Sequence, residues 1–305
     1  PSKKRSRGCV GRTEMFSYYA MKVLSRLVCL LPHGAAMVFG ECVARLAWIF
    51  VPAKRKTLAR EQIMRCLDVP AAEAARIART SALRFGPMLM EVLRFPVMKQ
   101  RMRDYVTITG AMDEVRAAIT GGHGAVFATS HSGNWELMGG AFACAGLPIV
   151  GVAKRQSSAG MDRFINEYRT LVGMHITYRS GVREMFRMID EGWIIGLISD
   201  QDPSLRDGVI IDFFGQRTNA FTGAAAIARR CGVPIFPVYI HRAPNGHHTL
   251  TVEPGIMVEK TDDRAADVKR VTQIINKRIE EWIRTYPEDW FWLHDRWKSV
   301  REESM

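Results

Sequence analysis

Residues 125–136 have the sequence Ala-Val-Phe-Ala-Thr-Ser-His-Ser-Gly-Asn-Trp-Glu, and the fold class can be argued outward from them. Four apolar residues and the β-branched Thr129 precede a polar run, a pattern typical of a short buried strand. Gly133 and Asn134 tolerate the positive φ angles that a tight turn can need. A helix is expected to begin at Trp135. A buried strand, a turn and a helix in direct succession are characteristic of α/β proteins.

The chain beyond residue 104 repeats this alternation of strands and helices. A hairpin through Pro244, Asn245 and Gly246 reverses one strand. We therefore predict an α/β fold with a mixed, mostly parallel sheet flanked by helices. Strands are expected over 105–109, 125–129, 148–152, 175–178, 193–199, 209–214, 235–240 and 248–253, and helices over 111–120, 135–145, 160–172, 182–191, 223–231 and 265–284.

Residues 14–103 are expected to be entirely helical. We assign residues 1–103 to a helical N-terminal extension that associates with a membrane. Residues 104–305 form the α/β core, and the two parts are expected to pack as one integrated domain. The Met-rich stretch 88–102 is expected to contribute to the core rather than to line a lipid site.

Composition narrows the function classes. Of the 305 residues, 47% are hydrophobic and 24% charged, as in ordinary globular proteins, which excludes a disordered or fibrous chain. The formal net charge of +12 indicates an anionic partner: nucleic acid, an acidic membrane face, a phosphorylated lipid or an acidic carrier protein. The six cysteines are scattered without a CxxC pair, which predicts reduced thiols rather than a disulfide frame or a zinc site.

The segment 15–51 is the candidate membrane element. No run of 18 apolar residues occurs in the chain, which argues against a conventional transmembrane helix. Basic residues at 3–7 and 54–56 flank the interrupted apolar blocks of this segment, a pattern that suits helices lying on an anionic leaflet. A buried helical hairpin with solvated ends is the alternative. A cleaved secretory signal is not expected, because no continuous apolar region precedes a small-residue cleavage site.

The polar residues after strand 125–129 are the candidate catalytic residues. His131 stands at the carboxyl end of a buried strand, where α/β proteins bind ligands. Glu136 can approach it only if His131 lies in the turn, since residues five apart on one helix point in different directions. A carboxylate beside an imidazole makes a general base. A satisfied structural histidine is the alternative.

Other catalytic motifs are absent from the sequence. It contains no GxSxG nucleophile elbow, no HExxH zinc motif and no Walker-type phosphate loop. A base without a protein nucleophile suggests that the substrate supplies the nucleophile, typically a hydroxyl group.

The segment from His131 to Glu136 resembles the H-x4-D/E motif of glycerolipid acyltransferases, in the form found in the lipid A biosynthesis acyltransferase family, which includes phosphatidylinositol mannoside acyltransferases. Further blocks in order are similar to this family. The chief departure is at the N-terminus, where many members carry a more continuous apolar anchor. The similar blocks are Lys154-Arg155, Asp200-Gln201-Asp202, residues 213–218 with Gly223 and Ala228, and residues 287–298.

The resemblance implies transfer of a fatty acyl group from an acyl carrier protein thioester to a hydroxyl of a lipid A precursor, without a metal or an organic cofactor. It implies that His131 takes the hydroxyl proton. Glu136, favoured by spacing, or Asp200 would orient the ring. Backbone N–H groups at 133–135 are candidate oxyanion donors. The implied substrate contacts are Asn134, Arg155, Asp202, Arg217 and Thr218, with Arg155 the candidate for an acceptor phosphate.

The family also implies a place on the cytoplasmic face of the bacterial inner membrane. Several alternatives stay open. The acceptor could be a phosphatidylinositol mannoside or a lysophospholipid, the donor could be acyl-CoA, and water could replace the acceptor in a hydrolase. Arg217 and Thr218 could serve a β-turn instead. Nucleic-acid binding is not expected, because no recognition motif accompanies the charge. A structural or adaptor role would leave the block at 131–136 without purpose. Trp290, Trp292 and Trp297 are expected to pack a C-terminal helix, with anchoring at the membrane interface as the alternative.

Overall fold

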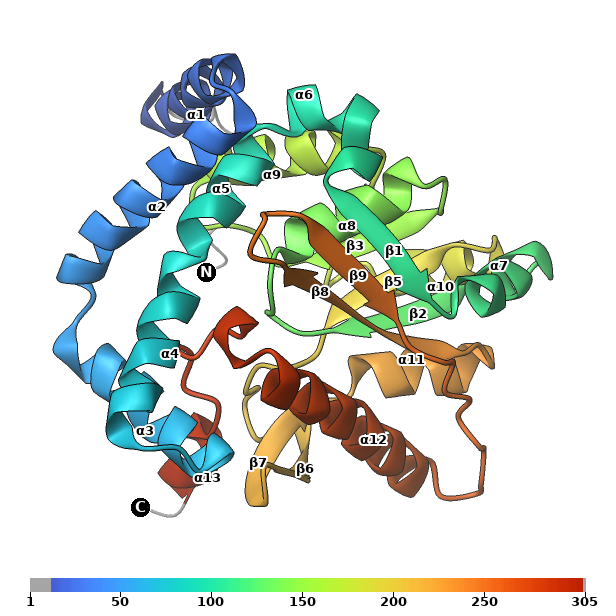
Figure 1. The fold of residues 1–305 in the computed structure, drawn as a ribbon. Coiled ribbons are helices and arrows are strands. Elements are labelled where there is room, and N and C mark those ends of the chain that lie inside the picture. The colour runs from blue at the N-terminus through green and yellow to red at the C-terminus, as the bar shows by residue number, and fades with distance from the viewer. Residues whose placement is uncertain (1–11, 304–305) are drawn as a thin grey trace, which may run out of the picture.

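The computed structural model describes residues 12–303, so the basic cluster at residues 3–7 and Cys9 lie outside the described residues. Within that range, seven strands form one sheet in the order β1-β9-β8-β2-β5-β3-β4 (Figure 1). The strands are β1 (Val106–Gly110), β2 (Ala125–Thr129), β3 (Ile149–Ala153), β4 (His175–Tyr178), β5 (Ile194–Ile198), β8 (Ile235–Arg242) and β9 (His248–Val252).

The sheet is mixed and mostly parallel, which confirms the predicted fold class. Strands β8, β2, β5, β3 and β4 are parallel to one another. Strand β9 is antiparallel to β8, and β1 pairs in parallel with β9. Every residue of β2 is buried, as expected for a central strand covered on both faces. The carboxyl ends of β2, β5, β3 and β4 therefore share one edge of the sheet, the usual ligand-binding edge in α/β folds.

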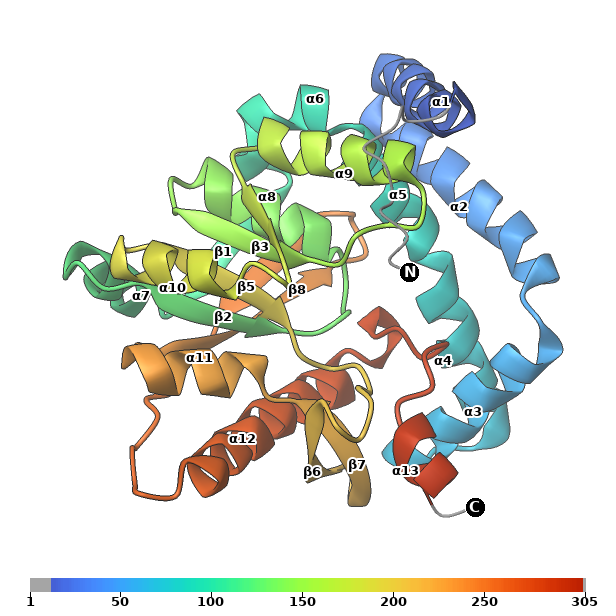
Figure 2. The ribbon, with the colours of Figure 1, turned by 180° about the vertical axis from the view of Figure 1, so that it is seen from behind.

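Helices cover both faces of the sheet (Figures 1 and 2). One layer contains α8 (Trp135–Cys144) and α9 (Ala159–Leu171), and the other contains α10 (Val182–Asp190), α11 (Gly223–Cys231) and α12 (Arg264–Thr285). A further helix, α7 (Met112–Thr120), follows β1. The two layers correspond to two hydrophobic clusters, one on each side of the sheet.

The segment before β1 is helical, as predicted. Pro32, Pro52 and Pro70 each stand directly before a helix, where the missing N–H of proline costs no hydrogen bond. Met90, Met98 and Met102 are buried in the same cluster as the sheet residues. The elements are α1 (Arg12–Leu30), α2 (His33–Phe50), α3 (Ala53–Leu67), α4 (Ala71–Leu83), α5 (Phe85–Leu93), α6 (Phe95–Met98) and the 3-10 helix η1 (Lys99–Asp104).

Two observations on these residues bear on the sequence predictions. Taken singly, no helix within residues 12–303 has both the length and the apolar composition to span a membrane; α2 and α3 meet those criteria only as a pair, bent by 104°. The cysteines within the same range are free thiols.

The C-terminal third departs from the prediction in two places. Strand β6 (Gly208–Phe213) pairs with β7 (Gln216–Phe221), a strand that the sequence did not predict, in a separate hairpin. Residues 290–297 are irregular, between the 3-10 helix η2 (Pro287–Asp289) and α13 (Lys298–Glu303). Trp290, Trp292 and Trp297 are buried there. Their packing in the core is confirmed, but the segment around them is irregular rather than helical, and their burial contradicts the alternative of anchoring at the membrane interface.

Candidate active site

His131 lies in the turn after β2, and its ring is held by Asp200 at the end of β5. Nδ1 of His131 lies 2.8 Å from Oδ1 of Asp200, and the backbone N–H of His131 donates to Oδ2 at 2.9 Å. The two residues meet because β2 and β5 are neighbours in the sheet. The double contact fixes the ring and places the Nδ1 proton toward the carboxylate, so Nε2 is the nitrogen that can accept a proton.

Residues 289 and 290 contact Asp200 and the turn that contains His131. The indole Nε1–H of Trp290 donates to Oδ2 of Asp200 at 2.7 Å, and Trp290 forms an isolated antiparallel bridge with Ser132. The N–H of Gly133 donates to the carbonyl of Asp289 at 2.9 Å. This contact removes the Gly133 N–H from the predicted oxyanion donors.

Gly133 is required by the geometry of the turn. Its φ is +58°, in the region that favours glycine. A Cβ at this position would lie 2.2 Å from the carbonyl oxygen of Ile240. Any side chain would therefore push the His131 turn away from β8.

The electrostatic surroundings favour a protonated imidazole. Burial by itself lowers the pKa of His131, but the carboxylates of Asp200 and, to a smaller extent, Glu136 outweigh it, and the pKa is raised above 6.5. Burial would raise the pKa of Asp200, yet the charge and hydrogen bonds of His131, with the Trp290 bond, hold it below its usual value. Asp200 is thus held as a carboxylate, and its charge makes the His131 imidazole more basic.

Glu136 does not contact the Nδ1 atom of His131. Its two carboxylate oxygens accept hydrogen bonds from Nε and Nη2 of Arg169, at 2.8 and 2.6 Å. Glu136 is the second residue of α8, and its side chain is engaged with α9. The preference for Glu136 as the orienting group, drawn from spacing, is therefore wrong; its charge acts on His131 only at longer range.

Asn134 caps α8 and does not fit the predicted substrate contact. Its side-chain oxygen accepts from the N–H of Leu137 at 3.0 Å, and its Nδ2 donates to Glu91 of α5 at 2.7 Å. The same Glu91 accepts from His248 of β9 at 2.8 Å. Asn134 is buried. Both ends of its amide are used to hold the start of the helix.

Asp202 and Thr218 hold the C-terminal segment, which corrects their predicted substrate contacts. Asp202 accepts from the backbone N–H and the hydroxyl of Ser299, both at 2.7 Å. Thr218 is fully buried and donates to the carbonyl of Arg296 at 2.9 Å. Arg217 is exposed on β7 and pairs with Glu303 at 3.4 Å, so its substrate role stays a prediction.

Basic residues follow the other strands at the ligand-binding edge. Lys154 and Arg155 come after β3, with the Arg155 guanidinium 4.3 Å from the centre of the Tyr178 ring. Arg179 comes directly after β4, and its charge reaches His131. Sequence reasoning missed Arg179, although its place after a strand is the same signal that singled out Arg155.

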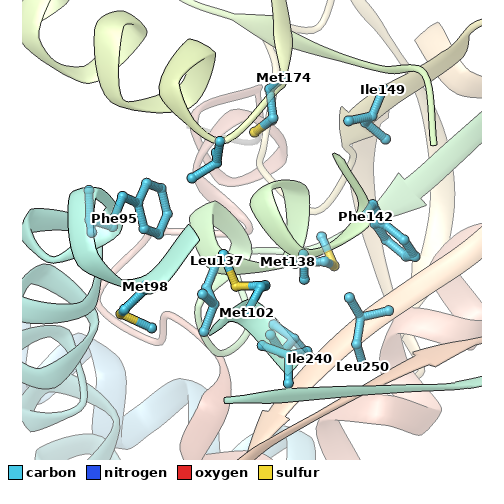
Figure 3. Close-up of a cluster of buried hydrophobic side chains, with 14 of the residues drawn as sticks. Phe95, Met98, Met102, Leu137, Met138, Phe142, Ile149, Met174, Ile240 and Leu250 are labelled. Atoms are coloured by element: carbon cyan, nitrogen blue, oxygen red, sulfur yellow. The ribbon is translucent and has the colours of Figure 1, made fainter. Parts of the chain in front are cut away.

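An apolar channel of about 90 Å³ lies between α8 and the sheet, lined at one end by Thr129 and Trp135, close to the His131 turn. Trp135 lines the channel, and its ring lies 4.9 Å from that of His131, at 78°. Figure 3 labels several of its side chains within the buried cluster. The channel is lined mostly by apolar groups, including Phe127, Trp135, Met138, Phe142, Ile149, Met174 and Val238, with the Glu136–Arg169 pair in the wall. No group of three or more metal-ligating side chains occurs within residues 12–303.

The family model for the bacterial lipid A biosynthesis acyltransferases matches residues 10–299. The chain belongs to this family. It is 30% identical over 280 residues to the phosphatidylinositol mannoside acyltransferase of Mycolicibacterium smegmatis, covering 89% of this chain and 88% of the relative. It is 22% identical over 279 residues to the lipid A biosynthesis lauroyltransferase of Escherichia coli, covering 90% and 89%. A member of this family is an O-acyltransferase that uses an acyl donor and a lipid acceptor.

Proposed function

We propose that this acyltransferase moves a fatty acyl group from a thioester to a hydroxyl of a phosphate-bearing membrane glycolipid, with His131 as the general base. The proposal rests on one observation: the ring of His131, held by Asp200, lies against Trp135, which lines an apolar channel. A base next to a channel fits a reaction in which one substrate carries the nucleophile and the other a hydrocarbon chain.

The proposed reaction requires one proton transfer in each direction. Nε2 of His131 takes the proton of the acceptor hydroxyl as its oxygen attacks the thioester carbonyl carbon. When the tetrahedral intermediate collapses, the carbon–sulfur bond breaks and the imidazolium returns the proton to the leaving thiolate, which gives an ester and a free thiol. Asp200 holds the Nδ1–H throughout and stabilises the transient imidazolium.

The headgroup and the donor are proposed to contact the basic edge. Arg155 and Arg179 are exposed and follow neighbouring strands β3 and β4. A guanidinium binds a phosphate bidentately, so Arg155 suits the phosphate of the acceptor. The same positive edge favours an acidic acyl carrier protein as the donor.

A phosphatidylinositol mannoside is the acceptor that we favour. The 30% identity to the mycobacterial enzyme exceeds the 22% identity to the lipid A enzyme over a similar length. A lipid A precursor is the second candidate, because the matching family model describes lipid A acyltransferases.

A two-by-two assay tests the function. Purified protein is given palmitoyl thioester on acyl carrier protein or on coenzyme A, with phosphatidylinositol mannoside or a lipid A precursor, and products are identified by mass spectrometry. We expect an added acyl ester on the mannoside with the carrier protein. If only the lipid A precursor gains an ester, the proposed acceptor is wrong and the lipid A precursor takes its place. If transfer from coenzyme A is faster, the proposed donor is wrong and acyl-CoA takes its place. Free fatty acid without acylated lipid would overturn the transferase proposal in favour of hydrolysis.

We also propose that α1 and α2 lie on an anionic membrane leaflet, at the cytoplasmic face of the inner membrane. Exposed apolar side chains follow each helix at intervals of three and four residues. Arg26, Arg45, Lys54 and Arg55 are exposed on or just after the same helices, which matches an anionic lipid surface. The apolar stripes comprise Phe16, Tyr19, Val23, Leu27 and Leu30 on α1 and Phe39, Val43, Leu46 and Phe50 on α2.

The double substitution Leu46→Glu with Phe50→Glu should weaken membrane binding at least tenfold. Each side chain is more than half exposed in the free protein, and burial of such a side chain in the leaflet contributes about 1.5–3 kcal/mol. Sedimentation with vesicles of phosphatidylglycerol and phosphatidylcholine measures the partition. Met257→Glu is the control, since Met257 is equally exposed but lies after β9. Equal losses in both proteins would contradict the proposed surface.

A further inference from the structure

A buried carboxylate from α5 contacts the start of α8. Glu91 is 1% exposed, and its two oxygens accept hydrogen bonds from Nδ2 of Asn134 at 2.7 Å and from Nε2 of His248 at 2.8 Å. Nε of Arg242, at the end of β8, lies 3.9 Å from Oε1 of Glu91. Burial would raise the pKa of Glu91, but the charge and hydrogen bond of His248, the Asn134 bond and the Arg242 charge hold it below its usual value. Glu91 is therefore ionised in the interior of the protein.

Packing alone does not explain an ionised group at this position. Taking a carboxylate out of water costs free energy, and a well-packed apolar side chain of similar volume is often at least as stabilising. A buried carboxylate does, however, impose a direction on the polar groups around it, because it accepts hydrogen bonds and cannot donate them. The role of Glu91 therefore lies in the orientation of its neighbours.

Glu91 determines which way the side-chain amide of Asn134 points. Oδ1 of Asn134 accepts from the N–H of Leu137 at 3.0 Å, so the amide nitrogen is the atom left to contact Glu91. A flipped amide would place its oxygen against the carboxylate and its nitrogen against the Leu137 N–H, two repulsive contacts. The carboxylate thus holds Asn134 in the one orientation that caps α8.

The turn that carries His131 is attached to its surroundings at three points. Asp200 binds the ring and the N–H of His131. The third residue of the turn donates its N–H to the carbonyl of residue 289. The last residue, Asn134, donates to Glu91. The Asp200 contact orients the ring, whereas the contact at Asn134 fixes the place where the turn joins α8.

Helix α5 gives this contact a fixed support. It lies between α2 and the sheet in both views (Figures 1 and 2). A Cβ at Gly86 of α5 would collide with the carbonyl of Gly40 on α2, so the two helices meet backbone to backbone and α5 has no room to shift towards α2. On the sheet side, His248 of β9 binds the second oxygen of Glu91. The carboxylate is therefore held from both directions.

We propose that Glu91 is a positioning residue for acyl transfer: through Asn134 it fixes the turn that carries His131, and with it the place of Nε2 relative to the acceptor hydroxyl. The inference rests on the proposed function, in which His131 is the general base. The carboxylate contacts Asn134 rather than His131, so it acts through the helix cap. A misplacement of about 1 Å between a base and its substrate is enough to cost about 10²-fold in rate.

Two substitutions break the Glu91–Asn134 bond from opposite sides. Glu91→Met keeps the length of the side chain but offers at most a weak acceptor. Asn134→Ser keeps a residue that caps helices well, but its side chain is too short to reach Glu91. Each should lower kcat by about 10- to 100-fold and leave both KM values unchanged, because the geometry of the base is altered and not the binding of substrates. The double variant should be no slower than the slower single variant, since both changes break one bond.

Glu91→Gln should restore most of the activity that Glu91→Met loses. Its Oε1 can accept from Asn134 as the carboxylate does. Its Nε2 then faces His248, whose ring can present an unprotonated Nε2 when the proton is on Nδ1. That proton displaces no existing bond, because Nδ1 of His248 has no hydrogen-bond partner among the residues that the structure describes.

The experiment measures kcat and both KM values with the thioester and the glycolipid that the wild type uses. Rates are expressed per folded molecule, with folding followed by circular dichroism and thermal unfolding. Glu280→Met is the control, because Glu280 is also 2% exposed and accepts from the N–H of Phe214 at 2.9 Å, but belongs to α12, in the helix layer opposite α8. It should lower the stability and leave kcat unchanged. If Glu91→Met does not fold, Asn134→Ser carries the test.

The outcomes separate this role from a structural one and from the proposed function. Lower kcat at unchanged KM in the single variants, no further loss in the double variant and rescue by Glu91→Gln support it. Wild-type kcat in a folded single variant overturns it, as does an equal loss of kcat in Glu280→Met. Additive losses in the double variant, or no rescue by glutamine, also overturn it, because Glu91 would then not act through Asn134. In each of these cases the wild type still acylates the lipid. A wild type without transfer overturns the proposed function, and this role with it.

Discussion

The His131→Ala variant should keep its fold and lose about 10²–10⁴-fold in kcat for acyl transfer, the usual contribution of a general base. Nε2 is the ring nitrogen left to accept the proton, because Nδ1 of His131 is bound by Asp200. Truncation removes one hydrogen bond from the buried Asp200 carboxylate, which keeps those from the His131 backbone N–H and the Trp290 indole. Initial rates at saturating donor and acceptor measure the loss, and circular dichroism checks the fold. A folded variant with wild-type kcat would refute the base assignment.

The pH profile separates the base from its orienting partner. Only the neutral imidazole accepts a proton, so kcat/KM must fall as pH drops through the pKa of His131, which the site raises above 6.5. Asp200→Asn removes the charge that raises this pKa, so the acid limb should move to lower pH. The plateau should also fall, by about 10²-fold or more, since the tautomer is no longer fixed. Asp262→Asn, an exposed position after β9, should change neither quantity. An unmoved limb in Asp200→Asn would exclude the proposed positioning role.

Replacing Arg296 by alanine should destabilise the protein by about 3–5 kcal/mol, as expected when one member of a buried polar network is removed. Its guanidinium is completely buried, and burial lowers its pKa to about 10. It donates to Thr218 at 3.0 Å, to Asn276 at 3.3 Å and to the carbonyl of Asn219. These acceptors lie on β7 and α12, so their loss frees the C-terminal segment from both elements.

Urea unfolding of Arg296→Ala measures the effect as a lower transition midpoint. Arg301→Ala is the matched control, because Arg301 pairs with Asp295 at 2.6 Å but is half exposed. A surface pair of this kind contributes less than about 1 kcal/mol. Equal midpoints for the two variants would show that the Arg296 network contributes no more than a surface pair.

Local sequence patterns predicted the fold well where hydrophobicity alone defines an element. The strand at 125–129 and the helix at 223–231 have the predicted bounds, because apolar runs and turn residues mark both ends. Strand β7 was missed because its sequence, Gln-Arg-Thr-Asn-Ala-Phe, has no apolar alternation, and its burial comes from α13 and the C-terminal segment.

The site was predicted only in part. The sequence predicts His131 as a site residue, because it directly follows a buried strand. The sequence does not predict whether Glu136 or Asp200 orients the ring. That choice depends on the order of strands in the sheet and on Arg169 of α9, which binds Glu136. The contact of Trp290 with Asp200 spans 90 residues and leaves no local pattern in the sequence.

That long-range contact has a consequence for protein synthesis. The chain leaves the ribosome with its N-terminus first, so β2 and β5 can form before residue 290 has been added. The bridge from Trp290 to Ser132 and its bond to Asp200 need a loop closure over most of the core, which is a slow step. A growing chain can therefore join His131 to Asp200 before residue 290 is added, and Asp200 gains its indole hydrogen bond only after residue 290 has folded back onto the sheet.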